Sequence, residues 1–285
     1  MKTAIVTGAS GNMGQAVVRK LLSKGYYVIG TVIPNDPVAI DIRDPNFETV
    51  TVDLMNEDAS QEFIESIMAK QNRIDAAILT VGGFAMGKIA DTKTSDVSKQ
   101  IRLNFETAYN VARPVFNQMI KQKEGRIFLI GSRPGSDMHN SKGMVAYGIA
   151  KSLIFRLAEL INDEAKGYNV VASVIVPSTI DTPQNRQSMP ETDFNKWVKA
   201  EAIADVIYFY CSPEASVIRE PVINSLGFIQ SPPSRIRYAV GQRADAERAL
   251  SSMTRMAANE RLTVSPQCLP SMLLNRRTAT FPVQN

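Results

Sequence analysis

The chain has 285 residues, of which 44% are hydrophobic and 21% charged, a composition typical of a folded globular protein. It contains one histidine, His139, and two cysteines, Cys211 and Cys268, which argues against a serine–histidine triad, a histidine-rich zinc site and a disulfide framework. No apolar run approaches the length of a signal sequence or a membrane span. We therefore expect a cytoplasmic protein with no metal site and no membrane partner.

The net charge of +4 is unevenly distributed. Residues 228–285 contain eight Arg, no Lys and three acidic residues and thus carry +5, whereas residues 1–227 contain 24 basic and 25 acidic residues and carry −1. The basic segment lacks the interleaved aromatic residues of a nucleic-acid stacking surface. We expect no nucleic-acid partner, a main domain over residues 1–227, and a flexible or loosely attached basic tail over residues 228–285.

Residues 3–7 form a buried-strand pattern that runs into a glycine turn, defined here as residues 8–14, and an amphipathic helix is predicted over residues 15–23. In this context glycines let the backbone approach a dinucleotide pyrophosphate, whose charge meets the helix N-terminus. An ordinary tight turn between strand and helix is the alternative. The candidate cofactor-binding residues of the turn are Gly8, Ser10, Gly11, Asn12, Met13 and Gly14.

The next strand is predicted over residues 26–32. Folds that prefer NAD place an acid near the end of this strand, to bind the ribose diol. Here Val32 stands at the tip and Asp36 comes late, so the choice between NAD and NADP stays open. A third strand over residues 49–52 ends in Asp53 and Leu54, and a helix follows over residues 60–70; Asp53 either faces the adenine or caps the turn.

A fourth strand, residues 76–81, opens into Gly82 and Gly83, whose small size would let a cofactor lie against the backbone. In the helix predicted over residues 95–118, Asn104 faces either inward or solvent. A fifth strand, residues 126–130, ends just before Ser132.

A helix over residues 145–165 carries Tyr147 and Lys151 one turn apart, so that the two side chains share a face. Lowering a phenol pKa from about 10 to neutral requires about 4 kcal/mol. One positive charge at about 4 Å supplies a similar amount in an effective dielectric near 20. The pair is therefore a candidate acid/base couple, and a buried tyrosine beside a surface lysine is the alternative.

A strand over residues 169–176 leads into a turn over residues 177–183, and the polar, Met-containing segment of about 184–200 is interpreted as a lid. A helix over 201–210 and a strand over 220–225 complete the alternation of strands and helices. This alternation predicts an α/β fold with a doubly wound, mostly parallel sheet.

The ordered set of motifs resembles the short-chain dehydrogenase/reductase family over residues 1–227, beginning with the Thr7-Gly8-x-x-Gly11-x-x-Gly14 turn. The resemblance implies a Rossmann-type fold, an NAD(P)-dependent oxidoreductase and a homodimer or homotetramer. It assigns catalysis to a quartet of residues, Asn104, Ser132, Tyr147 and Lys151. Further cofactor contacts implied by the resemblance are Asp53, Leu54, Val81, Gly82, Gly83, Tyr147, Lys151, Pro177, Thr179, Ile180 and Thr182.

The resemblance also implies a role for each member of the quartet in reversible hydride transfer between nicotinamide and a small-molecule carbonyl or alcohol. Tyr147 would donate the proton, and Lys151 would lower the pKa of Tyr147 and bind the nicotinamide ribose. Ser132 would bind the substrate oxygen, and Asn104 would hold a water that links Lys151 to solvent.

Within the family, the segments that begin at Gly82, Tyr147 and Asp181 resemble dihydropteridine reductases, which implies a pterin-like substrate as an alternative. Two departures from that subgroup's pattern matter. Val32 replaces the subgroup's acid, which leaves a preference for NADH open. Ser132 is present where the subgroup has no catalytic serine, which favours ordinary carbonyl or alcohol chemistry. A third hypothesis, from another class, is a dinucleotide-sensing or scaffold protein without catalytic activity.

Overall fold

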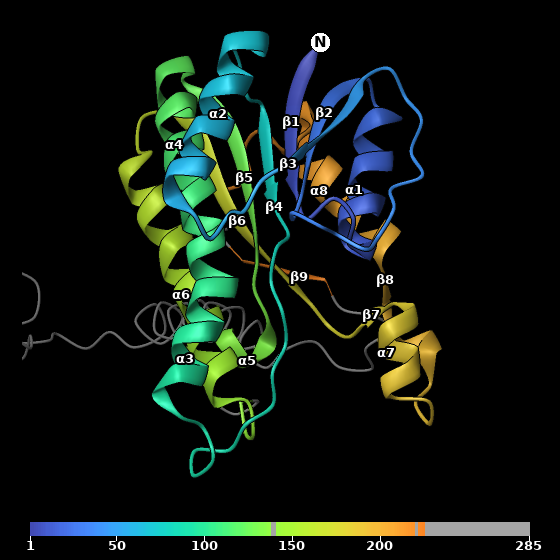
Figure 1. Ribbon diagram of the computed structural model, residues 1–285. Coiled ribbons are helices and arrows are strands. Elements are labelled where there is room, and N and C mark those ends of the chain that lie inside the picture. Colours follow the sequence, from blue (N-terminus) through green and yellow to red (C-terminus); the bar gives the residue numbers. More distant parts are fainter. Residues whose placement is uncertain (138–140, 220–221, 226–285) are drawn as a thin grey trace, which may run out of the picture. The chain divides into compact units, whose positions relative to one another are not determined.

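The computed structural model describes residues 1–137, 141–219 and 222–225. His139 and the basic tail predicted over residues 228–285 lie outside the described residues. The described chain is an α/β fold in which a parallel sheet lies between two layers of helices (Figure 1). The fold class predicted from the sequence is confirmed.

In the described part of the chain, seven parallel strands pair in the order β3-β2-β1-β4-β5-β6-β9. They are β1 (Lys2–Thr7), β2 (Tyr26–Val32), β3 (Phe47–Thr51), β4 (Ala76–Leu79), β5 (Glu124–Ile130), β6 (Asn169–Pro177) and β9 (Val222–Ser225). The order reverses at β1, because β2 and β3 lie on one side of it and β4 on the other. In open α/β sheets, ligands bind at such a switch point, outside the carboxyl ends of the strands.

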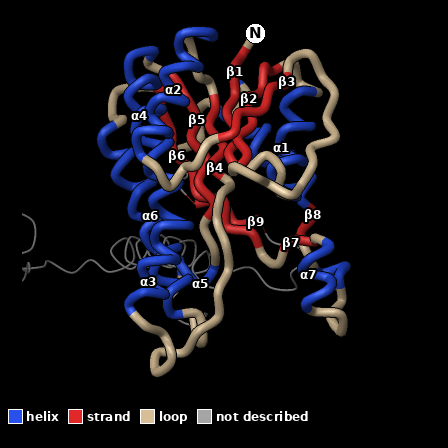
Figure 2. The backbone as a smooth tube through the Cα atoms, viewed as in Figure 1, coloured by secondary structure: helices blue, strands red, loops and turns tan. Residues whose placement is uncertain are grey.

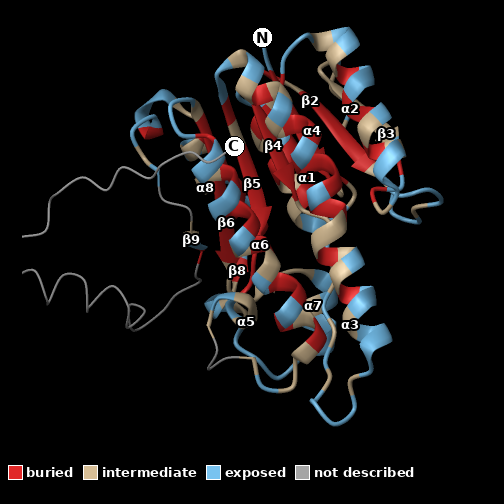
Figure 3. Ribbon diagram, turned by 90° about the vertical axis from the view of Figure 1, so that its left-hand side faces the viewer, coloured by how far each residue is buried: buried red, intermediate tan, exposed pale blue. Residues whose placement is uncertain are grey.

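The two helical layers cover opposite faces of the sheet (Figures 1 and 2). One layer contains α2 (Glu57–Gln71), α4 (Thr107–Gln122) and α6 (Val145–Glu164), and the other contains α1 (Asn12–Leu22) and α8 (Ala200–Tyr210). Strand residues alternate between the two cores: Leu129 of β5 packs in the first and Phe128 in the second, and both are buried. Figure 3 shows the central strands of the sheet coloured as buried. None of the helices in the described ranges combines the length and apolarity that a membrane span requires.

The elements differ from the predicted ones where the backbone is irregular. Helix α1 begins at Asn12 rather than at residue 15, because Gly11, with an extended backbone, is the N-cap. The single helix predicted over residues 95–118 is α3 (Thr94–Ile101), a π-helical turn (Arg102–Glu106) and α4, which continues to Gln122.

The segment interpreted as a lid contains helix α7 (Pro183–Ser188) and a 3₁₀ turn (Phe194–Lys196). Its ends are joined by a two-stranded sheet of β7 (Ile180–Asp181) and β8 (Val198–Lys199). Asn12 Nδ2 of the glycine turn donates to Gln184 Oε1 of α7 at 3.0 Å, so this segment contacts the start of α1. Closure of the segment over a substrate stays a prediction.

Candidate active site

The glycine turn connects β1 to α1 in a conformation that side chains would prevent. Gly8 has φ +62°, and its amide donates to Thr31 Oγ1 at 3.2 Å. A Cβ on Gly14 would overlap the carbonyl oxygen of Gly8. The first turn of α1 contains no acidic residue, so its unpaired amides leave a partial positive charge that suits a pyrophosphate. The turn therefore fits the dinucleotide that the sequence predicted for it.

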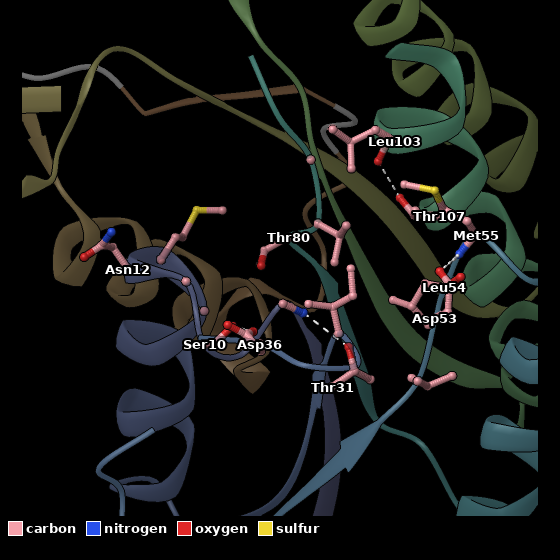
Figure 4. Close-up of a pocket in the computed structure, with 18 of the residues that line it drawn as sticks. Ser10, Asn12, Thr31, Asp36, Asp53, Leu54, Met55, Thr80, Leu103 and Thr107 are labelled. Atoms are coloured by element: carbon pink, nitrogen blue, oxygen red, sulfur yellow. Dashed lines mark hydrogen bonds between the residues drawn. The ribbon is translucent and has the colours of Figure 1, made fainter. Parts of the chain in front are cut away.

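A cavity of about 370 Å³ lies at this turn, between the carboxyl ends of the central strands, and is called here the switch-point cavity (Figure 4). Its lining includes these predicted cofactor residues: Gly8, Ser10, Gly11, Asn12, Met13, Gly14, Asp53, Leu54, Val81, Gly82, Ile180 and Thr182. Gly83, Tyr147, Lys151, Pro177 and Thr179 are not part of its lining.

Sequence reasoning missed several residues that line the cavity: Thr31, Ile33, Asp36, Val52, Met55, Thr80, Leu103 and Thr107. Thr80 has a clear structural role among them. Its amide donates a hydrogen bond to Thr7 Oγ1 at 3.0 Å, and its hydroxyl donates one to the Thr7 carbonyl at 2.6 Å. These bonds hold the ends of β1 and β4 together at the switch point. Threonine directly after a strand was the available signal, and it is too common a pattern to single out.

Asp53 caps the turn, as one of its two alternatives predicted, and the contact with the adenine stays a prediction. Its Oδ1 accepts a hydrogen bond from the Met55 amide at 3.0 Å, which caps the turn after β3, and the residue also lines the cavity (Figure 4). Asn104 faces inward, as one of its two alternatives predicted, and is 1% exposed.

The side-chain amide of Asn104 fixes the loop that follows β4. Its Oδ1 accepts from the Gly83 amide at 3.1 Å, and its Nδ2 donates to the Gly83 carbonyl at 3.0 Å and to Gln100 Oε1 at 3.0 Å. A Cβ on Gly82 would stand 2.6 Å from Asn104 Oδ1 and 3.2 Å from Lys151 Nζ. Asn104 and Lys151 therefore both lie next to Gly82, which itself lines the cavity.

Tyr147 and Lys151 lie on α6, and both titrate abnormally. Burial raises the pKa of the Tyr147 phenol, and the Ser132 hydroxyl offsets part of this rise. Burial lowers the pKa of Lys151 to about 8, and Lys151 Nζ donates to the Ile130 carbonyl at 2.8 Å. The expected lowering of the Tyr147 pKa is thus not found in this state, because desolvation of the phenol dominates.

Ser132 lies directly after β5 and is 6% exposed. Its Oγ is buried and makes no hydrogen bond of good geometry among the described residues, yet it lies close enough to the Tyr147 hydroxyl to lower the pKa of that phenol. Buried hydroxyls almost always have a partner, so an unpartnered one next to a phenol calls for an explanation.

An exposed aromatic ring lies beside Tyr147. The Phe84 ring packs edge-on against the Tyr147 ring, with 5.1 Å between centroids, yet Phe84 is 63% exposed. The Tyr147 ring thus has an apolar, solvent-exposed neighbour.

Gly14→Ala should weaken dinucleotide binding at least tenfold, because the new methyl group must displace the Gly8 carbonyl and with it the turn. The dissociation constant for NADH or NADPH, measured by fluorescence titration, checks this. Gly167→Ala is the control: Gly167 has φ +92° and open space around it, so alanine there should lower stability by about 1 kcal/mol and leave binding unchanged. Wild-type affinity in Gly14→Ala would show that the dinucleotide does not depend on this turn.

The fold and the cavity define a dinucleotide-binding α/β protein, and comparison with known proteins specifies the family. Residues 2–193 match the family model described as short chain dehydrogenase, and the chain belongs to that family. The acetoacetyl-CoA reductase of Acinetobacter sp. (strain RA3849) is 29% identical over 189 residues, which cover 64% of this chain and 75% of the relative. A 3-oxoacyl-[acyl-carrier-protein] reductase of Buchnera aphidicola is 27% identical over 227 residues, which cover 76% of this chain and 92% of the relative.

Among solved structures, ElxO with NADP bound has a similar fold, with a TM-score of 0.72 at 22% identity over 78% of this chain and 96% of its own. The protein is therefore an NAD(P)-dependent oxidoreductase of the short-chain dehydrogenase type. These matches do not show the narrower likeness to dihydropteridine reductases.

Proposed function

We propose that the protein reduces the carbonyl group of a small molecule to an alcohol, with Tyr147 as the proton donor. The unpartnered Ser132 hydroxyl carries this proposal. It lies beside the phenol, where a substrate oxygen would accept a hydrogen bond from it, and that oxygen gains negative charge in the transition state. A nicotinamide cofactor held at the glycine turn would supply the hydride.

The protonation state of Tyr147 suits the role of proton donor. Burial raises the pKa of Tyr147, so the phenol carries the proton that the substrate oxygen needs in the reduction. The ammonium of Lys151 then stabilises the phenolate that remains. Asn104 makes two hydrogen bonds with the Gly83 backbone and two with Gln100. These bonds hold the loop after β4 in place.

The exposed Phe84 ring beside Tyr147 favours a carbonyl with an apolar substituent. Two relatives are named for the reduction of acetoacetyl-CoA and of 3-oxoacyl-[acyl-carrier-protein], so a 3-oxoacyl thioester is the first substrate class to test. Loss of reduced-nicotinamide absorbance would be followed with acetoacetyl-CoA, a simple ketone and a quinonoid dihydropterin. Turnover of the pterin alone would contradict the proposal.

Ser132→Ala should lower kcat by roughly 10²-fold, because one oxyanion donor is lost, while the melting temperature stays unchanged, because the hydroxyl has no partner to lose. Ser60→Ala should show the reverse. Ser60 is fully buried in α2, and its Oγ donates to the Asn56 carbonyl at 2.8 Å, so its loss should lower the melting temperature and leave kcat intact. Full activity in Ser132→Ala would remove Ser132 from the reaction.

A further inference from the structure

A separate cavity of about 200 Å³ lies at the amino ends of the strands, the end of the sheet at which the N-terminus lies (Figure 1), and is called here the amino-end cavity. Its lining includes Lys2, Asp75, Glu124, Arg126, Asn169 and Cys211. Because the strands are parallel, this cavity is at the opposite end of the sheet from the switch-point cavity, and the two share no lining residue.

Two guanidinium groups converge on one neutral oxygen at the amino-end cavity. Arg126 Nη1 donates to the carbonyls of Gly125 and Asn169 at 2.9 and 2.8 Å, and its Nη2 donates to Asn169 Oδ1 at 3.1 Å. Arg219 Nη2 donates to the same Asn169 Oδ1, also at 3.1 Å. All of these acceptors are uncharged, and neither arginine forms an ion pair with a carboxylate among the described residues.

The two carboxylates in the lining are bound to other groups. Asp75 Oδ2 accepts from the Thr3 amide at 2.8 Å and from Arg73 Nε at 2.9 Å, so the charge of Asp75 is matched by Arg73. Glu124 Oε1 accepts from Asn169 Nδ2 at 3.3 Å. Neither carboxylate therefore acts as the direct partner of the two converging guanidinium groups.

The positive charge at the amino-end cavity is only partly offset. Burial, and after it the charge of Arg219, lower the pKa of Arg126, whose charged form thus pays for desolvation and for repulsion. Burial raises the pKa of the Cys211 thiol to about 12 and also raises the pKa of the Tyr26 phenol, so neither group is an anion at neutral pH. Lys2 adds a further cation to the lining.

Arg126 also has donors that its described neighbours do not use. One fork of its guanidinium, formed by Nη1 and Nη2, binds the two oxygens of Asn169. The Nε donor and the second Nη2 donor form the other fork, and they have no acceptor in the part of the chain that the structure describes. Such a fork matches the spacing of two oxygens in a carboxylate or a phosphate group.

We propose that the amino-end cavity is a second ligand site, which binds a small oxyanion, a phosphate or carboxylate group, on Arg126 with Arg219 as the second cation. The anion accepts from the unused fork of Arg126 and offsets the repulsion between the two guanidinium groups. With about 200 Å³, the cavity suits a small anion and is too small for a dinucleotide. The site is independent of the proposed carbonyl reduction, because it lies at the other end of the sheet.

The probe is inorganic phosphate, titrated calorimetrically into the full chain at neutral pH and constant ionic strength. Reduced nicotinamide cofactor is present in excess, so that phosphate does not bind at the glycine turn. Wild-type protein should bind one phosphate per chain. Arg126→Gln removes the fork and Arg219→Gln removes the second charge, so each should weaken phosphate binding by about tenfold, because a charge-assisted contact is lost.

Arg156→Gln is the charge-matched control, because Arg156 is exposed on α6 and pairs with Glu159, and it should bind phosphate as the wild-type protein does. A parallel titration with acetate distinguishes the two ligand classes: competition with phosphate indicates that a carboxylate fits the site as well, and its absence restricts the site to phosphate groups.

Absence of binding of both anions by wild-type protein, or unchanged phosphate affinity in Arg219→Gln, would overturn the proposal. An equal loss of affinity in Arg156→Gln would also overturn it, since the effect would then come from net charge. Arg219 is exposed, so Arg219→Gln should fold even if the replacement of Arg126 does not, and melting temperatures verify this. Because the site is remote from the switch-point cavity, Arg219→Gln should keep the wild-type kcat.

Discussion

Tyr147→Phe should lower kcat for carbonyl reduction by roughly 10²- to 10⁴-fold, the usual contribution of a positioned general acid. Phenylalanine keeps the ring that packs against Phe84, so the apolar surface and the fold should persist. The binding of NADH and NADPH should change little. Steady-state kinetics and a cofactor titration on the same preparation check both statements.

The control for this prediction is Tyr168→Phe. Tyr168 is 41% exposed, follows helix α6 and lies outside the quartet and the lining of the switch-point cavity. Loss of the Tyr168 hydroxyl should leave kcat at the wild-type value. If Tyr147→Phe turns over as fast as the wild-type protein, another group donates the proton and the proposed mechanism is wrong.

Lys151→Met should lower kcat by roughly 10²-fold or more and at the same time stabilise the protein at neutral pH. Lys151 is 4% exposed, and its pKa is about 8 in the folded chain, against about 10.4 for a free lysine. The folded state therefore binds fewer protons than the unfolded state between these two values, so the free energy of unfolding rises with pH across this window. Below pH 8 this contribution is lost, at a cost of roughly 3 kcal/mol relative to pH above 10.4.

Methionine carries no proton, so the variant should lack this rise between pH 8 and 10.4. Its gain at pH 7 is reduced by the loss of the hydrogen bond to the Ile130 carbonyl, which is worth about 1 kcal/mol or more. Chemical denaturation at several pH values measures the difference between variant and wild type. Lys166→Met, whose side chain is 78% exposed, should follow the wild-type pH dependence. A Lys151→Met profile parallel to the wild type would mean that Lys151 is not buried in its charged form.

The regular elements could be predicted because their signals are local. The apolar run of β2 gave the bounds found in the structure, Tyr26–Val32, and the helix of Tyr147 and Lys151 begins at Val145 as expected. The glycine turn could be predicted as well, because only glycine fits at two of its positions. Gly8 has a positive φ, and a Cβ on Gly14 would overlap the Gly8 carbonyl oxygen.

What could not be predicted depends on contacts between distant segments. Asp36 follows the tip of the second strand at a distance that leaves its role open in the sequence. Pro34 and Asn35 are residues typical of turns, but only the folded chain shows that this turn directs Asp36 to Ser10. The net effect on the Tyr147 pKa was also beyond reach, because it depends on how deeply the phenol is buried. A spacing of four residues on a helix indicates a shared face and gives no measure of desolvation.

The π-helical turn at Arg102–Glu106 marks the place where the length of this helical region can change during evolution. A π turn holds one residue more than an α turn, so the loss of one residue there can be absorbed by conversion to α-helix, which leaves the rotation of α4 about its axis nearly unchanged. The loss of one residue within α4 would instead rotate the rest of that helix by about 100° and move Met119 out of the core. Single-residue deletions in this region should therefore be tolerated at the π turn and selected against within α4.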